Sequence, residues 1–388
     1  MSVHFAYLSR GTLHVKDGDG EVRLVESRFG QSIRDRAVQI HDRNAWKTQG
    51  TGARFMGGGA LWGGVPRDAA ALRLSIAGIA RGVKNDELVY ALDTDEISGV
   101  FRLEEGGSAE QRLLHTADFR VGRLHSNGSD RIACTLARKG GNSCIAVMRP
   151  DGSEMIEVTQ GDAVDDSPHW LPGSSEELVF QSAAIGRDQN GFAAAKGPFT
   201  IQKLNLEQGQ VTTLLEDAQH DLLSPQMASD GSLYYIRRPY VNPRQGANFL
   251  RAAWDLVLLP FRLLFAIFQY LNFFTARYTG NTLTTAGGAR QKNADVRQMM
   301  IWGNLIEAGR AEGGADRGSK GVPKNWELMR RGADGKEEAL AKQVVSFDLC
   351  ADGSLLFSNG AGVYHRMARG EVTLLAEDGL IEQVIALA

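Results

Sequence analysis

Residues Asn142–Gly173 read NSCIAVMRPDGSEMIEVTQGDAVDDSPHWLPG, and this segment carries the strongest fold signal in the chain. Three short apolar runs follow it, at Glu177–Ser182, Phe199–Asn205 and Val211–Leu215. Each run is rich in β-branched and aromatic residues and is bounded by turn residues, which is the pattern of a β-strand. The region from Asp165 to Glu216 therefore predicts a unit of four strands.

The same unit recurs along the chain, and the turn after its first strand marks each copy. Such a turn precedes an apolar run at Asn85-Asp86, Asn127-Gly128, Pro172-Gly173, Asp230-Gly231 and Asp352-Gly353. The turns are about 42, 45, 58 and 122 residues apart, and the last step equals one period plus an insertion of roughly 75 residues. Four strands in about 40 to 50 residues are typical of a β-propeller blade.

The period predicts an all-β, six-bladed β-propeller. The outer strands of blade one are Val3–Leu8, Thr12–Lys16 and Val22–Glu26, and blades two to six span residues 72–115, 119–160, 165–216, 222–342 and 344–377. The last apolar run, Ile381–Leu387, has no blade of its own. We expect this C-terminal strand to complete the N-terminal blade, which closes the ring and removes an exposed sheet edge.

The repeat resembles the TolB-type (PD40/WD40-like) propeller repeat. The matching positions are Met148, Asp151, Gly152, Thr159, Asp166, Pro168 (or Ser167, depending on the register), Trp170, Pro172 and Gly173. The match is good at the junction of blades three and four, partial at 221–231 and 351–353, and covers about half of the chain. The resemblance implies a bacterial propeller that docks a protein partner, because the motif is specific for the fold rather than for a reaction.

Composition and charge exclude several classes of protein. The 388 residues hold 43 Lys and Arg against 46 Asp and Glu, so the net charge is −3, which argues against a nucleic-acid binder. The three cysteines, Cys134, Cys144 and Cys350, contain no CxxC pair, which argues against a disulfide framework and favours a reducing compartment. The N-terminus lacks the pattern of a secretory signal peptide. We therefore expect a cytoplasmic protein.

Residues 31–68 do not fit a blade and contain Trp46, Trp62 and the triplet Gly57-Gly58-Gly59. No Lys-Ser or Lys-Thr follows the glycines, so the spacing of a phosphate-binding loop is absent. We expect a long loop across one face of the propeller, with Trp46 and Trp62 as packing anchors or partner contacts.

The insertion in blade five divides the chain into residues 1–243, 244–322 and 323–388. Within Phe249–Phe274 a helix would carry its polar side chains in a narrow stripe and would be apolar elsewhere. The side chains expected at this membrane or partner interface are Phe249, Trp254, Leu258, Phe261, Arg262, Phe265, Phe268, Phe273, Phe274 and, from a second amphipathic helix over 295–308, Trp302. Together the two segments predict an α-helical hairpin.

Something must cover that apolar surface, and several covers remain open. A simple transmembrane helix is disfavoured, because Arg262 would lie near the bilayer centre and only twelve uncharged residues follow it. The alternatives are a helix in the plane of the inner membrane, an interface with another subunit or partner over 249–308, and packing on the propeller.

The sequence shows no catalytic motif. HExxH, HxH and GxSxG are absent, so we expect no zinc site, no serine hydrolase centre and no cofactor. His169 falls on an inner strand, with His125 and His220 near equivalent positions, and each is expected to be structural. The function predicted is a non-catalytic scaffold for protein–protein interaction, attached to a membrane or to other subunits by its insertion. The alternative is a propeller hydrolase or lyase with a channel metal near Asp166 and His169.

Overall fold

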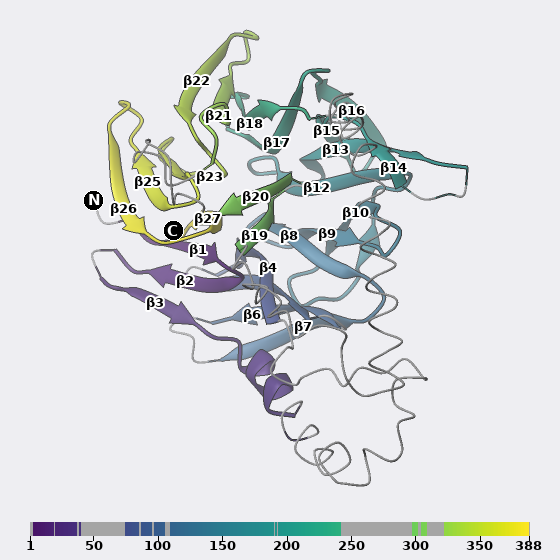
Figure 1. Ribbon diagram of the computed structural model, residues 1–388, viewed down its shortest axis with the longest axis vertical. Coiled ribbons are helices and arrows are strands. Elements are labelled where there is room, and N and C mark those ends of the chain that lie inside the picture. The colour runs from purple at the N-terminus through teal and green to yellow at the C-terminus, as the bar shows by residue number, and fades with distance from the viewer. Residues whose placement is uncertain are drawn as a thin grey trace, which may run out of the picture. The chain divides into compact units, whose positions relative to one another are not determined.

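The computed structural model describes residues 3–36, 39, 74–241 and 322–387, apart from short gaps at 19, 85–86, 95–96, 105–108, 190 and 192, and the backbone of 297–301 and 304–308. These residues are mostly β-strand (Figure 1). By its internal contacts the chain divides into two units, Val241–Arg317 and the remainder. Among the described residues no helix is long and apolar enough to cross a membrane.

Four sheets of the larger unit have four strands each. Their orders are β27 (Ile381–Ala386), β1 (Phe5–Ser9), β2 (Thr12–Lys16), β3 (Val22–Val25); β4 (Leu74–Arg81), β5 (Leu88–Thr94), β6 (Ser98–Leu103), β7 (Glu110–Thr116); β17 (His220–Met227), β18 (Leu233–Pro239), β21 (Glu327–Arg331), β22 (Glu337–Lys342); and β23 (Ser346–Leu349), β24 (Leu355–Ser358), β25 (Gly362–Arg366), β26 (Val372–Glu377). All pairs in these sheets are antiparallel.

A fifth sheet has nine strands, which form one unit of four strands and one of five. They are β8 (Arg120–Ser126), β9 (Ile132–Ala137), β10 (Ser143–Met148), β11 (Ile156–Glu157) and β12 (Ala163–Trp170), β13 (Glu177–Arg187), β14 (Ala193–Lys196), β15 (Thr200–Asn205), β16 (Gln210–Leu215). A single parallel bridge, Ser143 with Val164, joins the two units. The segment that matches the repeat motif thus spans the junction between them.

The recurring turns lie where the sequence predicts them, between the first and second strands of each unit. Gly128, Gly173, Gly231 and Gly353 occupy equivalent positions there, with φ of 76°, 72°, 80° and 80°. A side chain with a Cβ is strained in that conformation, so glycine is the residue that closes the turn at low cost. The Asn85-Asp86 turn lies outside the described residues.

The C-terminal strand β27 pairs antiparallel with β1, with Tyr7 opposite Val384. The backbone N–H of Leu387 also donates to the carbonyl of His4, so the two ends of the chain lie near each other (Figure 1). This is the strand pairing expected from the sequence. It gives the N-terminal sheet a first strand that comes from the other end of the chain.

We call β4, β8, β12, β17, β23 and β27 the inner strands. Each contacts the next in this order, and β27 contacts β4. The second strands, such as β5, β9 and β18, are almost continuously buried because a sheet covers each of their faces. The fourth strands β3, β16, β22 and β26 are largely exposed. Burial is thus greatest at the second strands, and the inner strands β4, β8 and β12 are only partly buried.

Two expectations about the insertions are wrong. Residues 28–36 form a helix, so the segment that was expected to be a loop from residue 31 begins as a helix. Arg297–Ile301 (β19) and Asn304–Ala308 (β20) form an antiparallel β-hairpin instead of the amphipathic helix expected over 295–308. Two residues, Trp302 and Gly303, separate the strands, and a two-residue connection that contains Gly favours a hairpin over a helix.

The other predicted interface residues lie outside the described part of the chain. These are Trp46 and Trp62, the residues from Phe249 to Phe274, and Trp302. Their roles stay predictions.

Candidate functional site

A cavity of about 460 Å³ opens where the C-terminal halves of the inner strands converge. Every inner strand contributes to its wall, through Arg81, His125, His169, Gln226, Asp348 and Gln383 among others. The turns that begin at Asn127 and Leu171 also line it. We call this cavity the channel mouth. Its position at the convergence of six separate strands means that residues far apart in the sequence share one site.

Two inner strands are bulged where they reach the channel mouth. The pairing of β12 shifts between Asp166 and His169, and that of β17 shifts between Leu223 and Gln226. A Ser-Pro pair fills each bulge, and Ser167 and Ser224 have φ of 52° and 50°. Left-handed backbone at a residue other than glycine is strained and needs local support.

Side chains supply that support. The backbone N–H of Ser167 donates to Asp166 Oδ1 at 2.7 Å, and the N–H of Ser224 donates to Gln181 Oε1 at 2.6 Å. Gln181 belongs to the unit before β17, so this second bond also links neighbouring sheets. The bulges are therefore held in place and present both Ser-Pro pairs to the cavity.

Two histidines stack in the cavity wall. The rings of His125 and His169 lie 3.6 Å apart, centroid to centroid, at an angle of 25°. The N–H of Trp170 donates to His125 Nδ1, and His169 Nδ1 donates to the carbonyl of Trp170, each at 3.0 Å. These bonds fix both tautomers and leave His169 Nε2 as an acceptor when the ring is neutral.

Burial keeps both rings neutral at pH 7. It lowers the pKa of His169 to about 4 and the pKa of His125 well below its usual value. His220, which the sequence placed near an equivalent position, lies at the start of β17 and bonds Asp217 at 2.8 Å. It does not line the cavity. The histidine pair thus forms a rigid, polar and uncharged part of the cavity wall.

Ion pairs place charge asymmetrically in the channel mouth. Arg81 lies 3.1 Å from Asp348, and the side chain of Arg81 is 39% exposed whereas that of Asp348 is 7% exposed. Glu87 is likewise buried, with an exposure of 4%, and pairs with Arg102 at 3.3 Å. Lys84 is exposed. The exposed charged side chains of the cavity are therefore cationic, and its carboxylates are buried.

Glutamines and one arginine join the inner strands around the cavity. Gln383 bonds both backbone groups of Ile79 on β4. Gln226 bonds the carbonyl of Phe347 and the N–H of Leu349 on β23. Arg123 donates to the carbonyl of Glu382 on β27 at 3.1 Å. Buried bonds to backbone groups of another strand fix the spacing of the strands.

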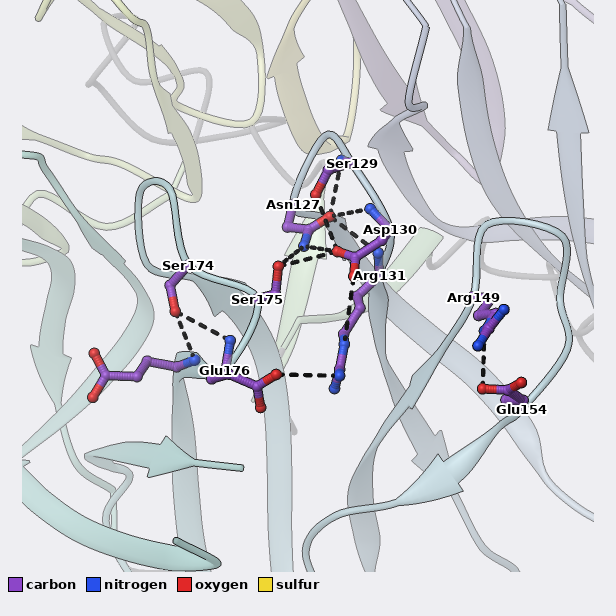
Figure 2. A network of polar contacts seen from close by, with 10 residues as sticks. Asn127, Ser129, Asp130, Arg131, Arg149, Glu154, Ser174, Ser175 and Glu176 are labelled. Carbon is purple, nitrogen blue, oxygen red and sulfur yellow. Dashed lines mark hydrogen bonds and ion pairs between the residues drawn. The ribbon is translucent and has the colours of Figure 1, made fainter. Parts of the chain in front are cut away.

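The rim beside the cavity is also cross-linked, as Figure 2 shows. Asn127 Oδ1 accepts from the backbone N–H groups of Ser129, Asp130 and Arg131. Ser175 donates to Asp130, and Arg131 reaches Glu176 at 3.2 Å. These contacts join the turn after β8 to the turn after β12. Each exposed pair is weak alone, but together they order the two turns.

The channel metal site of the alternative hydrolase or lyase function is not assembled in the described residues. Asp166 Oδ1 accepts from Thr135 Oγ1 at 2.8 Å and does not line the cavity with His169. No group of three or more His, Cys, Asp or Glu side chains in the described ranges could hold a metal ion. Cys134 and Cys144 are buried, and burial raises their pKa to about 12 and about 11. Their thiols are therefore unreactive at neutral pH.

Sequence reasoning missed Arg81, Lys84, Ser167, Ser224 and Gln226. One signal was available: Ser167-Pro168 and Ser224-Pro225 occupy the same place in consecutive repeats. A proline in the middle of a strand is a sign of a bulge. No local sequence pattern marked Arg81 and Lys84, because only the fold brings them into the same cavity as Asp348.

Comparison with known proteins identifies similar structures only. No family model and no curated protein matches the sequence. The structure of TolB from Acinetobacter baumannii is 11% identical, and the match covers 99% of this chain and 66% of that chain, with a TM-score of 0.52. This chain thus spans just under two thirds of that protein. A nidogen/laminin complex is 8% identical, with coverages of 100% and 98% and a TM-score of 0.52.

Enzymes are among the similar structures at lower scores. The tricorn protease is 10% identical, and the match covers 99% of this chain and 34% of that chain, with a TM-score of 0.41. At this similarity the comparison carries no argument about activity. At the identities of all three structures, similarity informs the fold alone.

Proposed function

Because the chain has the fold of a TolB-type β-propeller, we propose that it is a non-catalytic scaffold that binds a protein partner at the channel mouth. In this proposal the propeller has six blades, two of them within the nine-stranded sheet, and β27 closes the ring. The cyclic contacts of the six inner strands and the pairing of β27 with β1 support that arrangement.

The observation that carries the proposal is the construction of the channel mouth. Its wall is fixed by hydrogen bonds between inner strands, and one of its polar atoms, Ser167 Oγ, has no partner among the described residues. An unpaired buried polar atom is costly, and a ligand can supply the missing bond. One of the similar structures is that of a nidogen/laminin complex.

The test narrows the cavity without disturbing the core. Ala351 is exposed and lines the channel mouth, so Ala351→Trp fills the opening. Ala368 is equally exposed, in the turn after β25, and does not line it, so Ala368→Trp is the matched control. Tagged wild-type and variant proteins are purified from cells that make the protein, and their bound proteins are quantified by mass spectrometry.

We expect a protein that the wild type and Ala368→Trp retain and that Ala351→Trp loses. Binding of that protein to the purified chain is then measured by calorimetry. A partner that Ala351→Trp binds as well as the wild type does would place the interface elsewhere and overturn the proposal.

We also propose that the segment from Phe249 to Phe274 attaches the scaffold to the cytoplasmic face of a membrane or to another copy of the chain. Its apolar composition supports this proposal. Liposome flotation and light scattering after size exclusion separate the two cases. Flotation indicates a lipid surface, and a defined oligomer without flotation indicates self-association. A protein that shows neither flotation nor a defined oligomer would contradict this proposal.

A further inference from the structure

We propose that the segment received by the channel mouth carries a carboxylate, so that the partner is bound through an acidic side chain or through its C-terminus. This inference rests on the proposed function and specifies the chemistry of the partner at the same site. It follows from which charges the cavity exposes, which of its groups are already bonded, and which donors lack an acceptor.

The charges that a ligand meets in the channel mouth are positive. Lys84 is exposed, and the Arg81 side chain is 39% exposed. The two carboxylates of the wall, Asp348 and Glu87, have exposed fractions of only 7% and 4%. Because exposed charges act on a ligand most directly, the opening favours an anion over a cation.

The wall carboxylates are also committed to other groups. Asp348 Oδ2 accepts from Arg81 and from the backbone N–H of Ala386 at 2.8 Å. Glu87 Oε2 accepts from the N–H of Val83 at 3.0 Å. A cationic ligand would have to displace these bonds. An anionic ligand leaves them intact and adds an acceptor to the outer side of Arg81, whose guanidinium has five N–H donors.

A hydroxyl group in the cavity wall also lacks a hydrogen-bond partner. Ser167 is 9% exposed and lines the cavity, and its Oγ has no partner among the described residues. The ammonium group of Lys84 and the guanidinium group of Arg81 are donors without acceptor capacity. An ionised carboxylate is an acceptor and has no donor, so it complements these groups.

The ligand is inferred to be a peptide carboxylate rather than a free anion because the wall is also apolar. Pro168, Pro225, Leu349 and Leu387 line the cavity beside the polar groups. His169 Nε2 supplies an acceptor that a peptide N–H can use. A mixed wall of this kind fits an extended chain that ends in, or contains, a carboxylate.

The test uses four fluorescein-labelled hexapeptides on the full chain. All have the sequence Gly-Ser-Gly-Ala-Xaa-Leu, in which Xaa is Asp or Asn and the C-terminus is free or amidated. Binding is measured by fluorescence anisotropy at low and high salt, with inorganic phosphate as a competitor. Lys84→Glu reverses an exposed charge of the channel mouth, and Lys139→Glu makes the same change in the exposed turn after β9, outside the cavity.

We expect the neutral peptide, which has Asn and an amide, to bind at least about fivefold more weakly than the doubly acidic one. Lys84→Glu should weaken the acidic peptides about three- to tenfold, Lys139→Glu should not, and salt should reduce the difference. The single-carboxylate peptide that retains the affinity identifies the source of the carboxylate. Equal binding of all four peptides overturns the inference, and so does an equal effect of the two lysine variants.

Two further results separate this inference from the proposed function. Displacement by phosphate at the same concentration as peptide would show a small-anion site and would overturn the peptide assignment. If the partner is lost from Ala351→Trp but unaffected by Lys84→Glu, the proposed function stands and the carboxylate inference fails. If the peptides show the charge preference but Ala351→Trp keeps its partner, the proposed interface fails instead.

Discussion

Gln383 on β27 pairs with both backbone groups of Ile79 on β4, although 304 residues separate them. Its Nε2 donates to the Ile79 carbonyl at 2.8 Å, and its Oε1 accepts from the Ile79 N–H at 3.1 Å. Both bonds are buried. The C-terminal strand is therefore joined to the N-terminal sheet by the ladder to β1 and to the following sheet by this one side chain.

Replacing Gln383 with Leu should loosen the junction of the two chain ends. The substitution keeps the size of the side chain but leaves a buried N–H and a buried carbonyl without partners. We expect a loss of about 2 to 4 kcal/mol in the free energy of unfolding, measured by urea denaturation. Gln208→Leu changes an exposed glutamine in the turn after β15 and should have little effect. Equal midpoints for the two variants would contradict the role of Gln383.

Glu110 should anchor the helix at 28–36 to the sheet of β4–β7. Its Oε2 accepts from the N–H of Arg28 at 2.6 Å, and its Oε1 accepts from Ser27 Oγ at 2.9 Å and from the hydroxyl of Tyr90 at 2.5 Å. A carboxylate at the first N–H groups of a helix is favourable, and the buried Tyr90 hydroxyl needs its acceptor.

We therefore expect Glu110→Ala to release the helix before the sheet unfolds. Hydrogen exchange of residues 28–36 should become faster, and stability should fall by about 2 kcal/mol or more. Glu104→Ala, at an exposed position after β6, serves as the control. Unchanged exchange in the helix would show that its packing, with Phe29 against Phe101, is sufficient to hold it.

The pH dependence of the free energy of unfolding should reflect the burial of the two histidine rings. Since the pKa of His169 falls from 6.5 to about 4 on folding, the unfolded chain binds more protons between these values. Stability should therefore decrease as the pH falls from about 6.5 toward about 4, with a slope of up to about 1.4 kcal/mol per pH unit from this ring. Asp348 opposes the shift and Arg81 adds to it.

His169→Gln removes that titration and should make the pH profile shallower over the same range. His125, whose pKa is also lowered, stays in place and accounts for the remaining slope. His115→Gln changes an exposed ring and should leave the profile as it is. Parallel profiles for the wild type and His169→Gln would mean that the ring is not desolvated in solution.

The repeat was predictable because the local sequence of each unit contains its own strand and turn signals. Short β-branched runs and the glycines at 128, 173, 231 and 353 give strands and turns without reference to the rest of the chain. The hairpin at 297–308 was missed because Met299, Met300 and Ile301 fit an apolar helix face as well as a strand. The two-residue connection at Trp302-Gly303 was the better signal.

The channel mouth was not predictable in the same way. Arg81 and Asp348 are 267 residues apart and form an ion pair only because the inner strands contact one another around the cavity. No local pattern marks Lys84 as part of that site. The Ser-Pro pairs marked the bulges, but whether a bulge faces a cavity depends on the packing of neighbouring sheets.

Removing residues 245–320 should leave a folded propeller. The insertion leaves after β18 and returns before β21, and these two strands pair directly, with Arg237 opposite Glu327. The ends of this pair are fixed by buried contacts: Arg238 lies 4.9 Å from the Trp326 ring and bonds Asp221 at 3.0 Å. The pairing therefore does not depend on the removed residues.

We expect the deletion variant to keep the β-type circular dichroism spectrum and a single cooperative melting transition. If the Phe249–Phe274 segment binds lipid or a second copy, only the full chain should float with liposomes or form an oligomer. Arg238→Met serves as a positive control for damage, because it leaves Asp221 buried without its cation and should cost about 3 to 5 kcal/mol. A deletion variant that melts no higher than Arg238→Met would show that the insertion belongs to the core.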